Sequence, residues 1–579
     1  MSSSTTPELP TPHNHDHNTN NTQHTHTTGP HPTWPRLETE HLPTDADTVI
    51  IGSGFGGSVA AARLAQAGKD ILLLERGREW IPGEFPDDFA SVRRNIRTRH
   101  NPMGLFDLAL GLDVDRLIAN GLGGGSLIYA NVMLPPEPEV FNDPHWPEGI
   151  NLRTLTPYIG RVRAMLRPEH VQRAPKHVEP LTGLAHHHKL PVKPVPVAVN
   201  LTRPNEPNPH GIQQNTCTHC GNCVTGCNVG AKTTMRASYL PLAHTAGARI
   251  VTRTEVRTIE PSPNPHHRWR LRGWRLNYVG AHYERTPFTL DCTTVILSAG
   301  ALGTTALLLR SSAAGLALSP NLGHRFSGNA DSLALSYNAG ITRQAGIGAR
   351  DQFAPDSEYG PTIARMIDRR NGAHGHLIQD AVIPYPIATM LRRLLAGRFA
   401  LSGDERIYCD LRPGGCPPGC SAIEHSQLWL AMGTDEANGT VRLGPRGEPT
   451  VHWPDAHRQN IYRQQQDDFA HLSETGESIH ISNPRHLVRR SGIPAQSPVT
   501  VHALGGAAMG PNVDTGVIDR DHRVYTGHGN TTGTAVHPGL YVIDGAASPT
   551  SLGANPALTI AALAERAAER LLHHENETP

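Results

Sequence analysis

The sequence predicts an α/β fold in which one parallel-sheet domain is assembled from both ends of the chain. Three observations lead to this prediction. A glycine-rich turn at residues 52–57 lies between an apolar strand and an Ala-rich helix, and a second glycine cluster follows at residues 121–126. Near the C-terminus, Leu540–Gly545 is typical of a strand entering a turn, and a helix is expected over residues 559–572.

Bulk composition excludes some classes of protein. The 579 residues carry 52 basic and 52 acidic side chains, so the formal net charge is zero, which argues against a nucleic-acid partner. No apolar run reaches the roughly 18 residues that span a bilayer. The N-terminus has neither a basic flank with an apolar core nor a twin-arginine pair, so we expect a cytoplasmic protein. Residues 1–40 are rich in Thr and His and poor in apolar residues, and they are expected to be a disordered tail.

The first ordered elements form a β-α-β unit. Residues 48–51 (TVII) are β-branched and apolar, which predicts a buried parallel strand. Residues 58–67 predict a helix that ends at Gly68, and residues 71–75 (ILLLE) predict the second strand.

The turn within this unit has the spacing of a dinucleotide-binding motif. Gly52 permits a tight turn, Gly54 lets the backbone approach a pyrophosphate, and Gly57 lets the helix pack closely on the strand. The pyrophosphate then lies at a helix N-terminus, where free N–H groups favour negative charge. Glu75, at the end of the second strand, is placed to accept hydrogen bonds from a ribose diol. The motif by itself does not separate FAD from NAD.

The middle of the chain is less regular. Residues 249–259 and 267–276 are expected to form antiparallel strands. Residues 294–298 predict a buried strand, and residues 301–311 predict the helix after it. Residues 330–500 do not divide clearly into elements.

Two further segments favour FAD over NAD. Residues 121–126 (GLGGGS) allow the backbone to lie against a flavin or its pyrophosphate, a duty that a NAD enzyme does not require. The pair Asp544–Gly545 and the Asn555-Pro556 turn return to the cofactor in flavoproteins of this architecture.

Together these segments identify a family resemblance. IIGSGFGGSVAAARLAQAG, LGGGSLIYANVM, HALGGAAMG and LYVIDGAASPTSLGANPALTIAALAERAAERL are similar to the glucose–methanol–choline (GMC) oxidoreductase family, and most closely to its bacterial cholesterol oxidase branch. The resemblance reaches from about residue 47 to residue 572 and is weakest between about 330 and 490.

The resemblance implies a Rossmann-like FAD-binding domain, discontinuous in sequence, and a mixed-sheet substrate-binding domain. The first part of the FAD-binding domain spans residues 47–330, the substrate-binding domain residues 331–490, and the second part residues 491–575. The further residues expected to bind FAD are Gly123, Gly124, Gly125, Ser126, Val256, Asp544 and Gly545.

The family's catalytic pair falls on His502 and Asn555. Hydride can leave a carbinol carbon only as the hydroxyl proton is lost, so an imidazole must receive or orient that proton. An amide donor beside it can stabilise the developing alkoxide. The family often has proline after this histidine, whereas this chain has Ala503. Members of the cholesterol oxidase branch also carry a glutamate that isomerises the steroid double bond, and Glu424 is the nearest match.

Four cysteines form a separate cluster, an insertion at residues 217–227. Cys217, Cys220, Cys223 and Cys227 have the spacing C-x2-C-x2-C-x3-C, which bacterial ferredoxins use for an iron–sulfur cluster, although Asn228 replaces the usual proline. Zinc and a buried loop of cysteines without metal are the alternatives. A cluster would carry electrons from the flavin to an external acceptor.

The expected activity is oxidation of a secondary alcohol on a sterol, with O2 as acceptor. Two alternatives stay open: a dehydrogenase for another alcohol or a sugar, with an external electron acceptor, and a non-catalytic flavin–cluster electron carrier. Residues 387–399 (IATMLRRLLAGRF) combine apolar residues and three arginines at helical spacing. They suggest either a peripheral membrane contact or a helix exposed to solvent.

Overall fold

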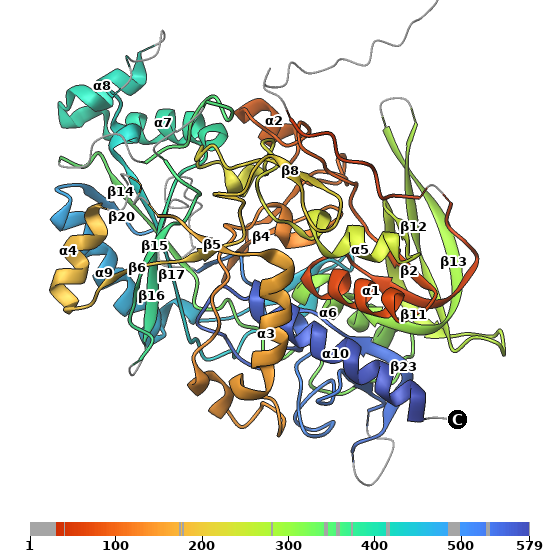
Figure 1. The fold of residues 1–579 in the computed structure, drawn as a ribbon. Coiled ribbons are helices and arrows are strands. Elements are labelled where there is room, and N and C mark those ends of the chain that lie inside the picture. The colour runs from red at the N-terminus through yellow and green to blue at the C-terminus, as the bar shows by residue number, and fades with distance from the viewer. Residues whose placement is uncertain are drawn as a thin grey trace, which may run out of the picture.

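The computed structural model describes residues 31–39, 41–172, 175, 179–279, 282–340, 346–354, 359–371, 375–412, 417, 419–483, 498–527 and 533–577. Two large sheets organise these residues (Figure 1). One has a parallel core that includes both ends of the chain, and the other is built from the middle of the chain. The α/β fold predicted from the sequence is confirmed.

The parallel core of the first sheet has the strand order of a Rossmann-like domain. Its five strands run parallel, and the two strands nearest the N-terminus lie between strands from later in the chain. In spatial order they are β10 (Arg249–Val251), β2 (Ile71–Leu74), β1 (Asp45–Ile51), β13 (His282–Leu297) and β23 (Val536–Val542). The predicted strands at 48–51, 71–75 and 294–298 all lie here, and β22 (Arg523–Tyr525) adds to the edge.

The first half of β13 leaves this core and pairs antiparallel with β12 (Trp269–Val279), which pairs with β11 (Thr254–Pro261). The antiparallel pairing expected for residues 249–259 and 267–276 is confirmed for β11 and β12 but is wrong for residues 249–251, which form the parallel strand β10. The chain turns at Arg253, whose φ is +55°, and splits the segment into parallel β10 and antiparallel β11.

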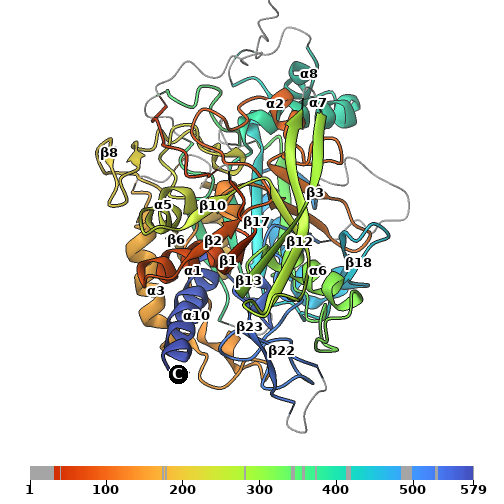
Figure 2. The same cartoon turned by 90° about the vertical axis from the view of Figure 1, so that its right-hand side faces the viewer.

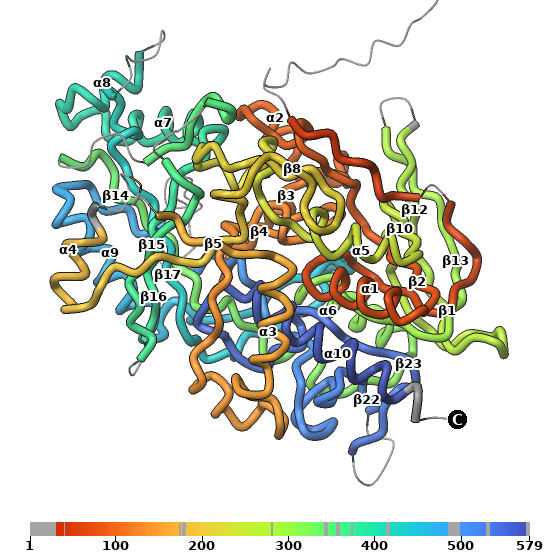
Figure 3. The backbone as a smooth tube through the Cα atoms, viewed as in Figure 1, coloured from red at the N-terminus to blue at the C-terminus, as the bar shows by residue number. Residues whose placement is uncertain are grey.

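Helices cover both faces of this sheet. Figure 2 shows α1 (Phe55–Gln66), α5 (Tyr239–Thr245) and α10 (Ala557–Glu577) on one side and α6 (Gly300–Ala313) on the other. The tube in Figure 3 places red α1 beside blue α10, although about 500 residues separate them. The buried Glu565 of α10 accepts two hydrogen bonds from Arg63 of α1 and one from the Tyr239 hydroxyl, which fixes this contact.

The second sheet contains six strands that pair antiparallel throughout the described residues, where the sequence predicted a mixed sheet. In spatial order they are β20 (Ile479–Ile481), β14 (Ser332–Tyr337), β17 (Gln427–Gly433), β16 (His376–Ala381), β15 (Arg365–Asp368) and β6 (Val192–Pro194). The helices α4 (Glu179–His188) and α9 (Asn460–Thr475) pack on one face through a core that includes Trp429 and Phe469.

A third sheet has three strands, whose segments lie between those of the two larger sheets in the sequence. Its strands are β3 (Phe106–Ala109), β4 (Asp115–Ala119) and β21 (Val499–Thr500), and β21 pairs parallel with β4. The remaining elements are α2 (Phe89–Arg94), α3 (Leu152–Leu166), β5 (Glu169–His170), β7 (Pro196–Val197), β8 (Glu206–Pro207), β9 (Gln213–Gln214), α7 (Tyr385–Phe399), α8 (Glu405–Leu411), β18 (Thr440–Leu443) and β19 (Pro449–His452).

The last residues of the expected N-terminal tail are ordered. Residues 1–30 lie outside the described part of the chain, but Trp34 and Leu37 are buried at 6% and 4% exposure. The Trp34 indole donates to the Gln213 carbonyl, and the Leu37 amide donates to the Glu79 carboxylate. These two apolar anchors attach the segment to the rest of the chain.

Candidate active site

The first glycine turn leaves space at one glycine and none at the others. A Cβ on Gly52, whose φ is +100°, would lie 2.3 Å from the Ser298 carbonyl oxygen. A Cβ on Gly57 would lie 2.0 Å from the Gly52 carbonyl oxygen, so this glycine lets α1 pack on the turn after β1. A Cβ on Gly54 would meet no atom within 4 Å. The open side of the turn is therefore at Gly54, at the N-terminus of α1, where an anion is favoured.

Glu75 is fixed beside this turn. It is 7% exposed, and its carboxylate accepts hydrogen bonds from the Ser53 amide and hydroxyl on one oxygen and from the Gly77 amide on the other. These donors orient the carboxylate, and its remaining lone pairs suit the hydroxyls of a ribose.

The second glycine cluster packs directly on the first. Gly124 has a φ of +53°, and a Cβ there would lie 2.7 Å from the Gly54 Cα. The Gly123 amide donates to the Ser53 hydroxyl at 3.0 Å, and the Ser126 hydroxyl donates to the Gly123 carbonyl. A Cβ on Gly125 would meet only Phe55, at 4.0 Å. Residues 52–57 and 123–126 thus form one glycine-lined cradle.

The C-terminal segment closes this cradle. A Cβ on Gly56 would lie 1.7 Å from the Ile543 carbonyl oxygen, so α1 begins against the end of β23. The Asp544 carboxylate accepts from the Gly300 amide, the Thr304 hydroxyl and the Ala546 amide, and burial raises its pKa to about 6. The Gly545 carbonyl accepts from the Gly505 amide at 2.9 Å, which joins this segment to the loop after His502.

Val256 lies two residues after a backbone contact with Glu75. It is buried in β11 at a bulge between residues 256 and 258, and the amide of Thr254 in that strand donates to the Glu75 carbonyl. The described structure therefore places all of the predicted cofactor residues around the C-terminal ends of the parallel strands, where nucleotides bind in such sheets.

His502 is held by a buried acid that the sequence did not reveal. Its Nδ1 lies 2.8 Å from Oδ1 of Asp331, which is 1% exposed. The second oxygen of Asp331 accepts from the Thr500 hydroxyl at 3.1 Å and from the Val501 amide at 3.0 Å. The imidazole is partly exposed, and its other nitrogen, Nε2, has no hydrogen bond within the part of the chain that the structure describes.

The side chain of Asn555 is held by a residue of the second sheet. The side-chain amide of Gln379, in β16, donates to Asn555 Oδ1 at 2.9 Å. The backbone before Asn555 is clamped by Asn329, whose amide donates to the Ala554 carbonyl and whose oxygen accepts from the Leu552 and Gly553 amides.

One segment links the two predicted catalytic residues. Residues 327–331 pair with Leu504 through Ser327, clamp the loop before Asn555 through Asn329, and bind His502 through Asp331. Sequence reasoning missed Asp331, Gln379 and Asn329, because they lie inside the region where the resemblance is weakest or at its edge. The Gly-Asn-Ala-Asp run at 328–331 is the only local signal, since asparagine tolerates the left-handed φ of +59° found at Asn329.

Glu424 lies away from these contacts. It belongs to a short 3-10 helix, Ala422–His425, before β17. Its carboxylate accepts from the Gly419 amide at 2.7 Å and lies 3.7 Å from Arg392 of α7. No contact among the described residues joins Glu424 to His502 or Asn555.

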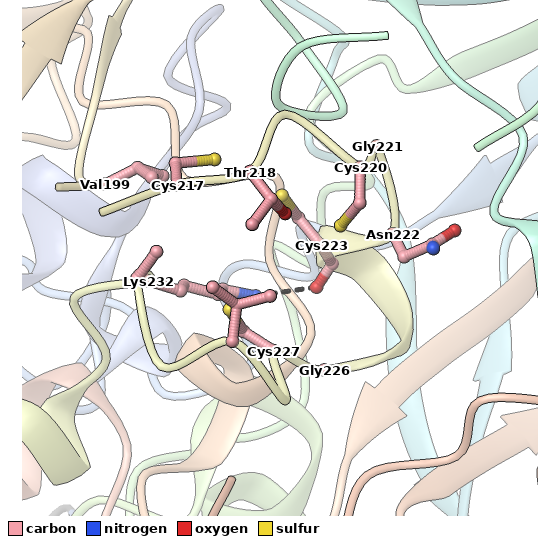
Figure 4. A pocket seen from close by; sticks show the side chains of 12 residues that line it. Val199, Cys217, Thr218, Cys220, Gly221, Asn222, Cys223, Gly226, Cys227 and Lys232 are labelled. Atoms are coloured by element: carbon pink, nitrogen blue, oxygen red, sulfur yellow. Dashed lines mark hydrogen bonds between the residues drawn. The ribbon is translucent and has the colours of Figure 1, made fainter. Parts of the chain in front are cut away.

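The four cysteines line one small cavity, of about 10 Å3, with Lys232 beside them (Figure 4). Burial raises the pKa of Cys217, Cys220 and Cys227, that of Cys220 to about 12. Across the described residues, no three His, Cys, Asp or Glu side chains are arranged to hold a metal ion. The cavity has room for about one water molecule. As they stand, these residues do not fit an iron–sulfur cluster.

Lys232 ties this cysteine loop to the glycine cradle. Its buried ammonium donates to the carbonyls of Cys223, Leu127 and Tyr129 at 2.7–3.0 Å, and burial lowers its pKa to about 8. Leu127 and Tyr129 directly follow the second glycine cluster. The loop therefore supports the cradle through a cation whose three donors are all used.

The helix expected at residues 387–399 is present as α7. Pro386, Ala388, Leu395 and Ala396 are buried in it, while Met390 is 41% exposed. The guanidinium Nε of Arg392, also in α7, lies 3.3 Å from the Asp410 carboxylate. Within the described residues, no helix combines the length and the apolar character needed to cross a membrane.

Sequence comparison agrees with this fold. Residues 46–329 and 436–564 match the N-terminal and C-terminal models of the GMC oxidoreductase family, together more than half of the chain. The protein therefore belongs to the GMC oxidoreductase family. It is an FAD-dependent oxidoreductase that acts on CH–OH donors.

Several characterised relatives align over almost the whole chain. A cholesterol oxidase of Mycobacterium tuberculosis is 30% identical over 90% of both chains, and one of Acinetobacter baumannii is 27% identical over 90% of this chain and 94% of its own. The paromamine 6'-oxidase of Streptomyces fradiae is 26% identical over 90% of both chains. Among solved structures, a formate oxidase superposes with a TM-score of 0.59 at 13% identity, covering 92% of this chain and 99% of that one.

Proposed function

We propose that this enzyme oxidises the secondary hydroxyl of a sterol-like substrate, as the cholesterol oxidases that it resembles do by name. FAD, when bound, accepts the hydride from the carbinol carbon. The glycine cradle with Glu75, Val256 and Asp544 would hold it, because Gly54 and Gly125 leave the backbone open to a phosphate or a flavin ring.

His502 and Asn555 supply the two functions that the alcohol oxygen needs. His502 receives the hydroxyl proton as the C–H bond breaks, and Asn555 donates a hydrogen bond to the alkoxide that develops. The observation that carries this assignment is the buried segment at residues 327–331, which binds the segments of both residues.

Exposed apolar side chains beside His502 favour a lipophilic substrate over a sugar. Leu110 and Leu112, in the turn between β3 and β4, are 62% and 75% exposed. Val501, directly before His502, is 45% exposed, and Leu108 of β3 is 46% exposed. Because β21 pairs with β4, this apolar rim (Leu108, Leu110, Leu112 and Val501) lies next to the catalytic histidine. A sterol is delivered from a membrane surface, and such a rim provides the contact.

The test is anaerobic mixing of the holoenzyme with cholesterol, a long-chain aliphatic alcohol or an aminoglycoside, with the flavin absorbance followed in time. Bleaching by cholesterol at the highest rate is expected. His502→Ala should lower that rate by about 10²-fold or more, the usual contribution of a positioned base. His537→Ala, at an exposed histidine on β23, is the matched control and should react like the wild type. An unchanged rate in His502→Ala would refute the assignment.

We propose O2 as the electron acceptor, with no step through the cysteine loop. Anaerobically purified protein should contain FAD but less than about one tenth of an iron atom per chain. Cys220→Ser and Cys223→Ser should consume O2 with cholesterol at the wild-type rate. Stoichiometric iron and acid-labile sulfide would overturn this part of the proposal and restore the cluster predicted from the cysteine spacing.

Isomerisation of the steroid double bond by Glu424 is a separate proposal. It is supported only by the resemblance around Glu424, whose carboxylate is engaged by Gly419 and Arg392. Product analysis decides it: Glu424→Gln should release the unisomerised ketone while flavin reduction continues. A fully isomerised product would exclude Glu424 from this step.

A further inference from the structure

The two side chains assigned to the chemistry are each held by one buried polar side chain near the second sheet. We propose that Asp331 and Gln379 are positioning residues that set His502 Nε2 as a hydrogen-bond acceptor and Asn555 Nδ2 as a donor, both towards one substrate oxygen. The inference rests on the proposed function, since it assigns the acceptor role to His502 and the donor role to Asn555, the pair that handles the alcohol.

Asp331 determines which nitrogen of His502 carries the proton. A carboxylate only accepts hydrogen bonds, so the 2.8 Å contact places the hydrogen on His502 Nδ1 and leaves the Nε2 lone pair free. The other carboxylate oxygen is occupied by Thr500 and Val501. Thr500 also accepts from the His502 amide at 2.9 Å. The backbone amide and the imidazole of His502 are therefore held by two residues that also bind each other, Thr500 and Asp331.

Gln379 determines which way the Asn555 amide faces. Gln379 is fully buried, and its Nε2 donates to Asn555 Oδ1. With Oδ1 used in this way, the amide presents its N–H groups on the opposite side, as stabilisation of an alkoxide requires. The clamp by Asn329 prevents the loop from following a change at Asn555.

The segment at residues 327–331, which joins these contacts, is under backbone strain. Ala330 has a φ of +46°, a left-handed conformation that is unfavourable for alanine. The buried Asp435 holds it there, by accepting from the Ala330 amide at 2.8 Å and from the Ser327 hydroxyl at 2.9 Å. Strain maintained by buried partners is typical of functional segments, and here it lies between Asn329 and Asp331.

The first experiment inverts the hydrogen bond to His502. In Asp331→Asn the new amide can donate to Nδ1, which moves the proton to Nε2 and removes the acceptor. The rate constant of anaerobic flavin reduction should fall by about 10²- to 10⁴-fold, while the substrate Kd from the same titration changes by less than about 3-fold. A base that receives the hydroxyl proton is expected to make the wild-type reduction rate depend on pH, and this dependence should disappear in the variant. Asp331→Glu, which keeps a carboxylate, should recover part of the rate.

A matched control exists in this chain. Asp468 of α9 forms a buried hydrogen bond of the same kind with His376 Nε2, at 2.9 Å. Asp468→Asn should lower stability but leave the reduction rate and its pH profile as in the wild type. If Asp331→Asn does not bind FAD, Thr500→Val is the second variant, since it removes both the hydroxyl donor to Asp331 and the acceptor of the His502 amide. The Asp331 carboxylate still sets the His502 tautomer there, so the reduction rate should fall while its pH dependence is kept, and an unchanged rate would overturn the positioning role.

The second experiment makes the Asn555 orientation depend on pH. In Gln379→Glu a protonated carboxyl can still donate to Asn555 Oδ1, whereas the ionised form attracts Nδ2 and turns the amide. The variant should reduce its flavin nearly as fast as the wild type at low pH and lose at least about 10-fold as this glutamate ionises, above its usual pKa because the site is buried. Gln427→Glu, at a buried glutamine of β17 that donates to the Ala381 carbonyl, should add no such step.

The outcomes separate two failures. If His502→Ala and Asn555→Ala reduce flavin at the wild-type rate, the proposed function is wrong. If those variants are impaired but Asp331→Asn keeps the wild-type rate and pH profile, or Gln379→Glu shows no pH-dependent loss, only the positioning inference is overturned.

Discussion

Gly54 and Gly57 lie three residues apart in one turn, but an added methyl group would meet different surroundings at each. At Gly54 the φ of −67° is one that alanine adopts readily, and no protein atom lies within 4 Å of the new Cβ. At Gly57 the Cβ would lie 2.0 Å from the Gly52 carbonyl oxygen, where an ordinary contact is 3.4–4 Å. We therefore expect Gly54→Ala to affect the cofactor and Gly57→Ala to affect the protein itself.

The magnitudes follow from these contacts. Gly54→Ala should leave the free energy of unfolding of the FAD-free protein unchanged or raise it by up to about 1 kcal/mol, because alanine restricts the unfolded chain. Loss of one charge-assisted hydrogen bond to the pyrophosphate costs roughly 1.5–3 kcal/mol, which is about a 10- to 150-fold higher Kd for FAD. Gly57→Ala must separate α1 from the turn after β1, and overpacking of this kind costs about 1–3 kcal/mol without any cofactor present.

Two measurements on deflavinated protein test this contrast. Urea unfolding followed by tryptophan fluorescence gives the stability, and titration with FAD followed by quenching of flavin fluorescence gives the Kd. The reasoning is refuted if Gly54→Ala destabilises the FAD-free protein as much as Gly57→Ala does. It is equally refuted if Gly54→Ala binds FAD as tightly as the wild type.

Three further outcomes are expected. Burial by itself would raise the pKa of Asp468, but the hydrogen bond and charge of His376 and the charge of Arg369 outweigh it and hold that pKa at about 2. Its contribution to stability is present above the unfolded-state value near 4 and is lost as the pH falls towards 2, so Asp468→Asn should lower the urea midpoint at about pH 6 and far less at about pH 2. Glu565→Leu leaves Arg63 without its buried partner and should cost about 3 kcal/mol in thermal or urea unfolding, whereas Glu569→Leu, at an exposed position of α10, should cost much less. Leu110→Asp with Leu112→Asp should weaken sedimentation with cholesterol-containing liposomes while the rate with detergent-dispersed cholesterol is kept, and unchanged sedimentation would exclude the apolar rim as the lipid contact.

The parallel core could be predicted from sequence because its signals are local. The apolar strands at 48–51 and 71–75 and the glycines between them specify a β-α-β unit within about 30 residues. The second sheet could not be predicted in the same way. Its strand β16 reads HLIQDA, with three polar residues that are all buried. They are tolerated because Asp468, Asn555 and the amides of Ala364 and Arg365 supply partners from elsewhere. A hydrophobic pattern cannot show such a strand.

The same limit applies to the site. His502 and Asn555 lie in segments whose neighbours resemble a known family, so a motif finds them. Asp331 and Gln379 act through partners 171 and 176 residues away in the chain, and each is a single polar residue without a motif of its own. The N-terminal tail shows the reverse case, because Trp34 and Leu37 are ordinary apolar residues whose docking onto Gln213 and Glu79 no pattern in a low-complexity segment indicates.

The placement of these partners explains why the site is built from distant segments. His502 and Asn555 belong to the C-terminal part of the chain, which packs on the glycine cradle through Ile543. Their hydrogen-bond partners come instead from β16 and from the residue before β14, in the second sheet. The backbone positions of the pair are thus set by the first sheet, and the hydrogen bonds to their side chains come from the second sheet and the residue before β14. Neither the tautomer of His502 nor the direction of the Asn555 amide is determined until both sheets are in place, so a substitution that shifts one sheet against the other should impair the chemistry before it impairs FAD binding.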